Sequence, residues 1–130
     1  MGEKQRTISK EVSLSDIGLH TGKKVNLTFC PVKENYGIKF QRTDLEGQPI
    51  IEADVDYVTD IQRGTTLTKN GNSVSTIEHS LAALTGLGID NCLIKIDSQE
   101  VPIMDGSSKP FIEILKKAGI KNLMLIKIIL

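Results

Sequence analysis

Two adjacent residues in the middle of the chain, Glu78 and His79, have side chains suited to hydrolytic chemistry. A neutral imidazole such as that of His79 can bind a metal ion, and the carboxylate of Glu78 can take a proton from a metal-bound water. Neighbouring residues of a helix point about 100° apart, so the two side chains cannot share one direction. They can still flank one small group above the start of a helix, which is compatible with metal-assisted hydrolysis.

The same two residues also have a purely structural interpretation. Ser75, followed three residues later by Glu78, is the sequence pattern of a capping box, in which the carboxylate bonds to the backbone of the serine. A single histidine in the first turn of a helix is more often a surface or packing residue than a ligand. The residues alone leave the chemical and the structural interpretation open.

The element that positions the pair is a predicted helix over residues 75–86. An apolar stripe recurs there at helical spacing, formed by Ile77, Leu81 and Leu84. Gly86 supplies the stop signal. Ala82 and Ala83 are small, so a second element can approach this helix closely.

Metal ligands are scarce in the chain. It contains two histidines, His20 and His79. A catalytic zinc ion normally takes three protein ligands, and no spacing of carboxylates or cysteines here indicates a third. If His79 binds zinc, we expect the other ligands to come from a part of the protein that this chain does not contain.

Composition excludes several classes of function. Sixteen basic and sixteen acidic side chains cancel, so no basic excess is present to neutralise the phosphates of a nucleic acid. No run of 18 apolar residues predicts a transmembrane helix, and the first residues have no apolar stretch typical of a secretory signal. Cys30 and Cys92 do not form a metal-binding or disulfide pattern and are expected to be reduced strand residues, as in a cytoplasmic protein.

Alternating polar and apolar residues predict a series of strands, at residues 7–14, 25–30, 38–42, 50–55 and 92–96. Asn70-Gly71 predicts a tight hairpin between residues 65–68 and 73–75. A second helix is expected after Ser107 or Ser108, with Pro110 in its first turn and Gly119 at its end. Its core-facing stripe consists of Phe111, Ile114, Leu115 and Ala118. This order predicts an α+β fold, with an antiparallel or mixed sheet and two helices packed on one face.

Residues 121–130 differ from the rest, because they are mostly leucine and isoleucine without a turn residue. This composition is typical either of a strand or of an exposed, aggregation-prone segment. We expect one domain over residues 1–120, an atypical apolar tail over 121–130, and a continuation of the protein that is missing here.

Five sequence motifs follow one another along the chain, namely Gly18-Leu19-His20-Thr21-Gly22-Lys23, Gln41-Arg42-Thr43-Asp44, Ser75-Thr76-Ile77-Glu78-His79, Gly86-Leu87-Gly88-Ile89-Asp90-Asn91 and Glu100-Val101-Pro102-Ile103-Met104-Asp105-Gly106-Ser107. In this order they resemble one enzyme family, UDP-3-O-acyl-N-acetylglucosamine deacetylase, the zinc amidase that commits bacteria to lipid A synthesis. The resemblance covers about residues 5 to 120.

The resemblance implies roles that the residues alone do not establish. Members of this family have two α+β domains with the active site between them, and this chain resembles the first domain only. His79 is then a zinc ligand and Glu78 the general base, whereas the remaining zinc ligands, a histidine and an aspartate, belong to the second domain. Four residues are implied to lie near the substrate: Leu19, His20, Arg63 and Gly64.

We therefore expect a domain of a cytoplasmic, zinc-dependent deacetylase that removes acetate from UDP-3-O-acyl-N-acetylglucosamine and is inactive without its second domain. The face meant for that domain is expected to cause self-association. Two alternatives remain, a non-catalytic binding or scaffold domain of the same fold, and a different hydrolase in which Glu78 is only a cap.

Overall fold

The computed structural model describes residues 2–62 and 64–127. Three sheets, two α-helices and one short 3-10 helix make up this part of the chain. In chain order the elements are β1 (Lys4–Ile8), β2 (Val12–Ile17), β3 (Lys24–Cys30), β4 (Ile38–Arg42), β5 (Ile50–Glu52), η1 (Val55–Tyr57), β6 (Val58–Asp60), β7 (Thr66–Lys69), β8 (Asn72–Val74), α1 (Glu78–Gly86), β9 (Cys92–Ile96), α2 (Lys109–Ala118) and β10 (Ile120–Ile126).

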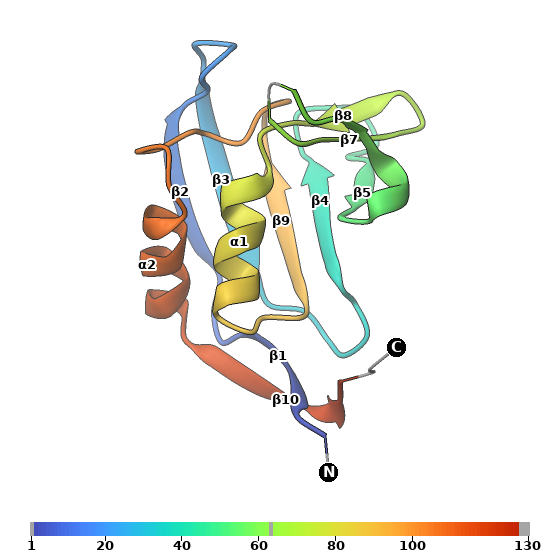
Figure 1. Cartoon of the computed structure of the whole chain (residues 1–130), viewed down its shortest axis with the longest axis vertical. Helices are drawn as coiled ribbons and strands as arrows, with labels where there is room; N and C mark the ends of the chain where they lie inside the picture. The colour runs from blue at the N-terminus through green and yellow to red at the C-terminus, as the bar shows by residue number, and fades with distance from the viewer. Residues whose placement is uncertain (1, 63, 128–130) are drawn as a thin grey trace.

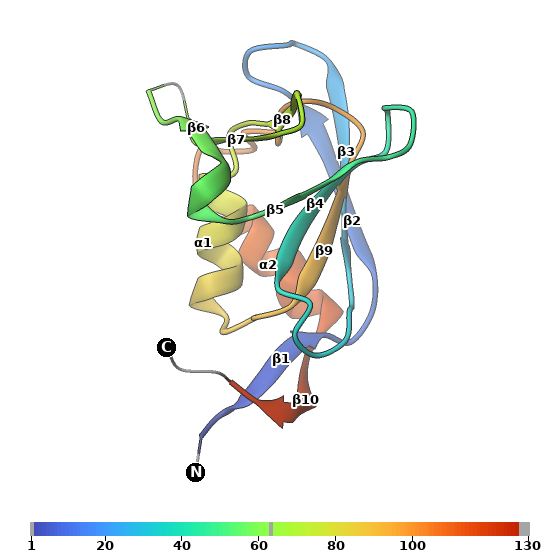
Figure 2. The same cartoon turned by 90° about the vertical axis from the view of Figure 1, so that its right-hand side faces the viewer.

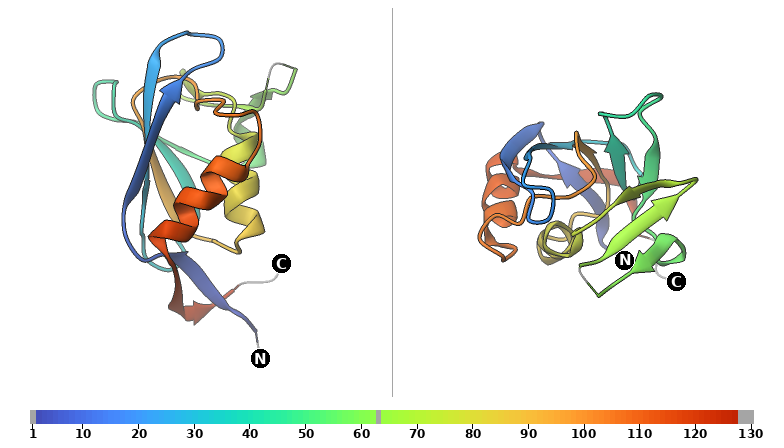
Figure 3. Two further views of the ribbon diagram at one scale, coloured as in Figure 1. Left: turned by 90° about the vertical axis from the view of Figure 1, so that its left-hand side faces the viewer. Right: turned by 90° about the horizontal axis from the view of Figure 1, so that it is seen from above.

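The central sheet has five strands in the order β2-β3-β9-β4-β5 (Figure 1). All neighbours in it are antiparallel except β4 and β9, which run parallel. Helices α1 and α2 lie side by side on the same face of this sheet (Figures 2 and 3). The predicted α+β fold, with a mixed sheet and two helices on one face, is therefore confirmed.

The core fills the space between this sheet and the two helices. The sheet contributes fully buried side chains, among them Phe29, Phe40, Ile94 and Ile96, and the helices contribute Ala83, Leu84, Phe111 and Leu115. The rings of Phe29 and Phe111 meet edge to face, with centroids 6.5 Å apart. Burial of these apolar surfaces fixes the helices against the sheet.

Helix α2 has the predicted features. Pro110 lies in its first turn, and Gly119 ends it with a φ of 81°, a conformation that favours glycine. Three members of the predicted stripe are buried, namely Phe111, Leu115 and Ala118, and Ile114 is half-buried. The 3.6-residue period therefore identified the core-facing side of this helix.

A second, three-stranded sheet is formed by β6, β7 and β8. The predicted hairpin is its β7–β8 part, and Asn70 and Gly71 at its tip have φ values of 52° and 81°. Both positive values match the turn that Asn-Gly favours. Arg42 braces this sheet to the central one, because its guanidinium donates to the Ser73 carbonyl oxygen at 2.7 Å and to both carboxylate oxygens of Asp44 at 2.9 and 2.8 Å.

The prediction of one strand over residues 7–14 is wrong. The chain leaves β1 at Ile8 and starts β2 at Val12, and β1 pairs with β10 outside the central sheet. The Ser9 N–H donates to the Gly119 carbonyl oxygen at 2.8 Å, which turns the chain at this point. Ile8, Val12 and Leu14 keep the same two-residue phase on both sides of the break, with only Lys10 between them, so the pattern did not reveal the break.

The apolar segment at the end of the described chain is a strand. Residues 120–126 form β10, which is antiparallel to β1. Leu123 is buried, whereas Met124, Leu125 and Ile126 are 79%, 46% and 52% exposed. The segment is therefore a strand, as one of the two alternatives predicted, and it also exposes apolar side chains, as the other predicted. Residues 128–130 lie outside the described residues. A domain boundary at residue 120 stays a prediction.

Candidate functional site

The predicted capping box at the start of α1 does not form. The helix begins at Glu78, and no side chain caps it. Ser75 is instead held in an extended segment, with its N–H 2.8 Å from the Gln99 carbonyl oxygen and its own carbonyl oxygen accepting from Val101 N–H at 3.0 Å. Pairing with residues 99–101 uses the Ser75 N–H, which Glu78 would accept in a capping box, and the Ser75 carbonyl oxygen, which the helix would use. The prediction that the helix starts at Ser75 is therefore wrong by three residues.

Glu78 bonds to a different partner, far away in the sequence. Its Oε1 accepts the Thr65 N–H at 3.1 Å, and the residue is half-buried. Gly64 lies beside the other oxygen, since a Cβ atom added to Gly64 would be 3.3 Å from Oε2 of Glu78. Gly64 also has a φ of +104°, which side chains rarely adopt. The structure therefore brings Glu78 and Gly64 together, two residues of the predicted site.

Thr76, which sequence reasoning did not single out, completes this group. It has a φ of 60°, an uncommon conformation for a β-branched residue, and it is 3% exposed. Its Oγ1 has no hydrogen-bond partner in the described part of the chain. A Cβ atom on Gly64 would be 3.3 Å from this oxygen. No pattern in the sequence marks a threonine for a positive φ.

His79 follows Glu78 in the first turn of α1 and is half-buried. Within residues 2–62 and 64–127, no group of three or more histidine, cysteine, aspartate or glutamate side chains is arranged to hold a metal ion. His79 is therefore not part of a complete metal site within the described residues. Neither cysteine is suited to act as a nucleophile. Cys30 and Cys92 are both buried, and burial raises the pKa of Cys92 to about 12.

Leu19 and His20 lie on the loop between β2 and β3. Leu19 is 58% exposed, and the side chain of His20 is 50% exposed. The backbone N–H of His20 donates to the Glu100 carboxylate, at 2.9 Å to Oε1 and 3.2 Å to Oε2. The side chain of Glu100 is buried, with 2% of its surface exposed. The sequence did not predict this hydrogen bond, because His20 and Glu100 are 80 residues apart. This loop, the start of α1 and the segment after β9 lie at the same end of the molecule (Figure 1).

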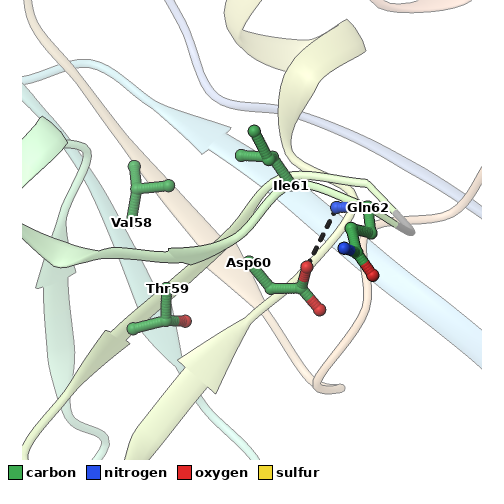
Figure 4. A pocket seen from close by; sticks show the side chains of 5 residues that line it. All are labelled: Val58, Thr59, Asp60, Ile61 and Gln62. Atoms are coloured by element: carbon green, nitrogen blue, oxygen red, sulfur yellow. Dashed lines mark hydrogen bonds between the residues drawn. The ribbon is translucent and has the colours of Figure 1, made fainter.

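The segment before Gly64 lines a hollow on the surface (Figure 4). Its five lining residues are consecutive, namely Val58, Thr59, Asp60, Ile61 and Gln62. Asp60 Oδ1 accepts the Gln62 N–H at 2.9 Å, and Ile61 is 74% exposed. Arg63, the remaining residue of the predicted site, lies outside the described residues.

No helix in the described ranges has the length and apolar character that a membrane crossing requires.

Comparison with known proteins gives one consistent result. A family profile described as LpxC, UDP-3-O-acyl N-acetylglycosamine deacetylase, matches residues 5–128. The chain is 51% identical over 120 residues to a UDP-3-O-acyl-N-acetylglucosamine deacetylase of Idiomarina loihiensis, covering 92% of this chain and 39% of that protein. It is 50% identical over 118 residues to a protein of Porphyromonas gingivalis named bifunctional enzyme LpxC/FabZ, covering 91% of this chain and 26% of that protein.

A protein of Bacteroides thetaiotaomicron with the same bifunctional name is 49% identical over 124 residues. The chain thus spans between 26% and 39% of the length of the curated relatives described here. These identities lie far above the level at which only a fold is shared, and the profile covers almost the whole chain. The chain belongs to the UDP-3-O-acyl-N-acetylglucosamine deacetylase family.

Proposed function

We propose that this chain supplies the general base and one metal ligand of a zinc-dependent amidase that removes acetate from UDP-3-O-acyl-N-acetylglucosamine in lipid A biosynthesis. Family membership supports the reaction class. The observation that carries the assignment to a residue is the carboxylate of Glu78. Thr65 N–H holds its Oε1 at 3.1 Å, and Oε2 faces Gly64, which has no side chain to cover it.

A general base needs a carboxylate that is fixed in position and has one oxygen left for the proton. In Glu78 the bond from Thr65 N–H fixes Oε1. No hydrogen bond from the described residues reaches Oε2, which can therefore accept a proton from an attacking water.

His79 fits one position of a zinc site and not a complete site. The described residues provide no second and third ligand beside it. We infer that the other ligands belong to a second domain of the enzyme. When bound, zinc would polarise the acetyl carbonyl group and lower the pKa of water toward about 7.

The substrate is proposed to contact four residues on two loops. Leu19 and His20 are exposed on the loop between β2 and β3, and Gly64 adjoins the carboxylate of Glu78. The assignment of Arg63 rests on the sequence resemblance. We place the reaction in the cytoplasm. The 130-residue chain by itself is expected to be inactive and to lose zinc on dialysis, because one imidazole binds zinc weakly.

The test uses a full-length enzyme, defined here as this domain joined to the remainder of the Idiomarina loihiensis relative. Acetate release from UDP-3-O-acyl-N-acetylglucosamine and bound zinc are measured for the unchanged enzyme, for His79→Ala and for Glu46→Gln. Glu46 is exposed on the turn between β4 and β5 and serves as the control. We expect His79→Ala to lose zinc and activity together, with Glu46→Gln unchanged.

Three outcomes would contradict the proposal. Normal zinc content and turnover in His79→Ala would remove His79 from the metal site. A folded full-length enzyme without zinc and without acetate release would favour the non-catalytic binding domain instead. Activity with stoichiometric zinc in the 130-residue chain alone would contradict the need for a second domain.

A further inference from the structure

Glu100 is a buried carboxylate to which the proposed function gives no role. It is 2% exposed and lies between β9 and α2. Burying a carboxylate is costly unless other groups compensate its charge. Within the described chain, the polar partners of this carboxylate belong to one residue: the backbone N–H of His20 lies 2.9 Å from Oε1, and His20 Nε2 lies 3.8 Å from Oε2. A carboxyl group buried at such a cost is expected to have a specific role.

The loop between β2 and β3 is built around this carboxylate. A Cβ atom on Gly18 would lie 2.6 Å from Oε1 of Glu100, so a side chain at this position would have to displace the carboxylate. The loop otherwise bonds to itself, through Gly18 N–H to the Lys23 carbonyl oxygen at 2.9 Å and Gly22 N–H to the Gly18 carbonyl oxygen at 3.0 Å. Among the described residues, the hydrogen bonds that join this loop to another segment are those of His20 N–H to Glu100.

The backbone around Glu100 is in turn joined to the start of α1. Ser75 N–H donates to the Gln99 carbonyl oxygen, and Val101 N–H donates to that of Ser75. Ser75 precedes Glu78 by three residues. Glu100 and its two neighbours thus connect the loop of Leu19 and His20 to the segment that leads into α1. The loop between β2 and β3, the segment after β9 and the start of α1 lie at one end of the molecule (Figure 1).

We propose that Glu100 is a positioning residue, which holds the loop of Leu19 and His20 against the start of α1 so that these two side chains meet the substrate on which Glu78 acts. This inference rests on the proposed function for its effect on turnover. The anchoring itself does not depend on that function and can be measured in the 130-residue chain.

The first measurement is amide hydrogen exchange at His20 in the 130-residue chain. Glu100→Ala removes the acceptor, so exchange at His20 is expected to become at least tenfold faster while β3 and β9 stay protected. Glu100→Gln keeps an acceptor oxygen and should restore protection. The control is Asp97→Asn, because Asp97 also accepts a backbone N–H, that of Asn26 at 2.8 Å, and Asn26 belongs to β3 and not to the loop.

The second measurement is steady-state kinetics in the full-length enzyme. Glu100→Ala should raise KM at least tenfold with a smaller change in kcat, because the loop is expected to bind substrate rather than to transfer protons. In a background in which Leu19 and His20 are both replaced by alanine, the same change should add little to the rise in KM, since both side chains that the loop presents are already gone. A merely structural role would lower stability and add to the effect of that double replacement.

The two measurements test the anchor and the positioning role separately. Unchanged exchange at His20 in Glu100→Ala overturns the anchor, and faster exchange with unchanged KM overturns the positioning role. If Glu100→Ala does not fold, Gly18→Ala replaces it, because its Cβ would displace the carboxylate from the loop side. An inactive but folded full-length enzyme would refute the proposed function, whereas the exchange result would still decide the anchor.

Discussion

Replacement of Glu78 by glutamine separates a proton acceptor from a structural carboxylate. The amide keeps the size of the side chain and one oxygen that can accept the Thr65 N–H, now 3.1 Å from Oε1. It cannot take a proton from water. We therefore expect the folded structure to persist and the chemistry to fail in the full-length enzyme.

The structural cost of this change is small. A hydrogen bond to a charged group is worth about 1 kcal/mol more than a neutral one, and the first-turn position contributes at most about 1 kcal/mol through the helix dipole. Because Glu78 is only half-buried, solvent screens both contributions, and we expect the replacement to lower the free energy of unfolding by about 1 kcal/mol in total. For a domain of this size that corresponds to a decrease in Tm of about 4 °C. Loss of a general base, in contrast, lowers the rate on the order of 10²–10⁴-fold.

The assay combines acetate release, bound zinc and Tm for Glu78→Gln, with Glu46→Gln as the matched change of an exposed carboxylate. Near-normal turnover at normal zinc content would refute the base assignment. A fall in Tm of more than about 10 °C would also refute the reasoning, because it would mean that Glu78 supports the fold far more than its single hydrogen bond indicates.

Three further predictions concern the domain itself. Gly64→Ala should lower turnover more than Gly47→Ala, since both glycines have positive φ but only the Cβ at Gly64 meets the site, and kinetics of the two full-length variants checks this. The Arg42 guanidinium holds the pKa of Asp44 below its usual range, so the stability from this pair is present above the ordinary aspartate pKa and is lost as pH falls through the lowered one. Urea unfolding of Asp44→Asn should show a weaker loss of stability below about pH 4 than the unchanged chain. The 130-residue chain should self-associate through the exposed apolar side chains of β10, and light scattering should show less association for Met124→Lys. A chain that is monomeric at all concentrations would contradict this prediction.

Local patterns explain why much of the fold could be predicted. The β7–β8 hairpin follows from Asn70-Gly71, whose two positive φ values come from residues that tolerate them. Helix α2 follows from its apolar period and from Gly119, which ends it. In each case the residues that determine the structure are close together in the sequence. In α2, burial in the core stabilises the same apolar side chains that form the sequence pattern.

The site was less predictable because its contacts are distant in the sequence. Ser75 and Glu78 have the correct spacing for a capping box, yet pairing with residues 99–101 removes Ser75 from the helix. Glu78 then bonds to Thr65, 13 residues earlier, and His20 bonds to Glu100, 80 residues later. The sequence identified the Glu78–His79 pair, but it did not identify the residues around the pair. No local pattern specifies which distant segments pack against the start of a helix.

The conformation of Thr76 shows how these distant contacts fix the site. A β-branched residue with a φ of 60° and a buried hydroxyl without a described partner is unfavourable on both counts, by on the order of 1–3 kcal/mol each. Both flanking residues are fixed by bonds to other segments, Ser75 to residues 99–101 and Ile77 N–H to the Thr65 carbonyl oxygen at 3.4 Å. The chain between them must turn sharply from extended segment to helix within one residue. That turn sets the direction in which α1 begins, and with it the approach of Glu78 to Thr65 and Gly64, so the strain at Thr76 follows from the position that the carboxylate requires.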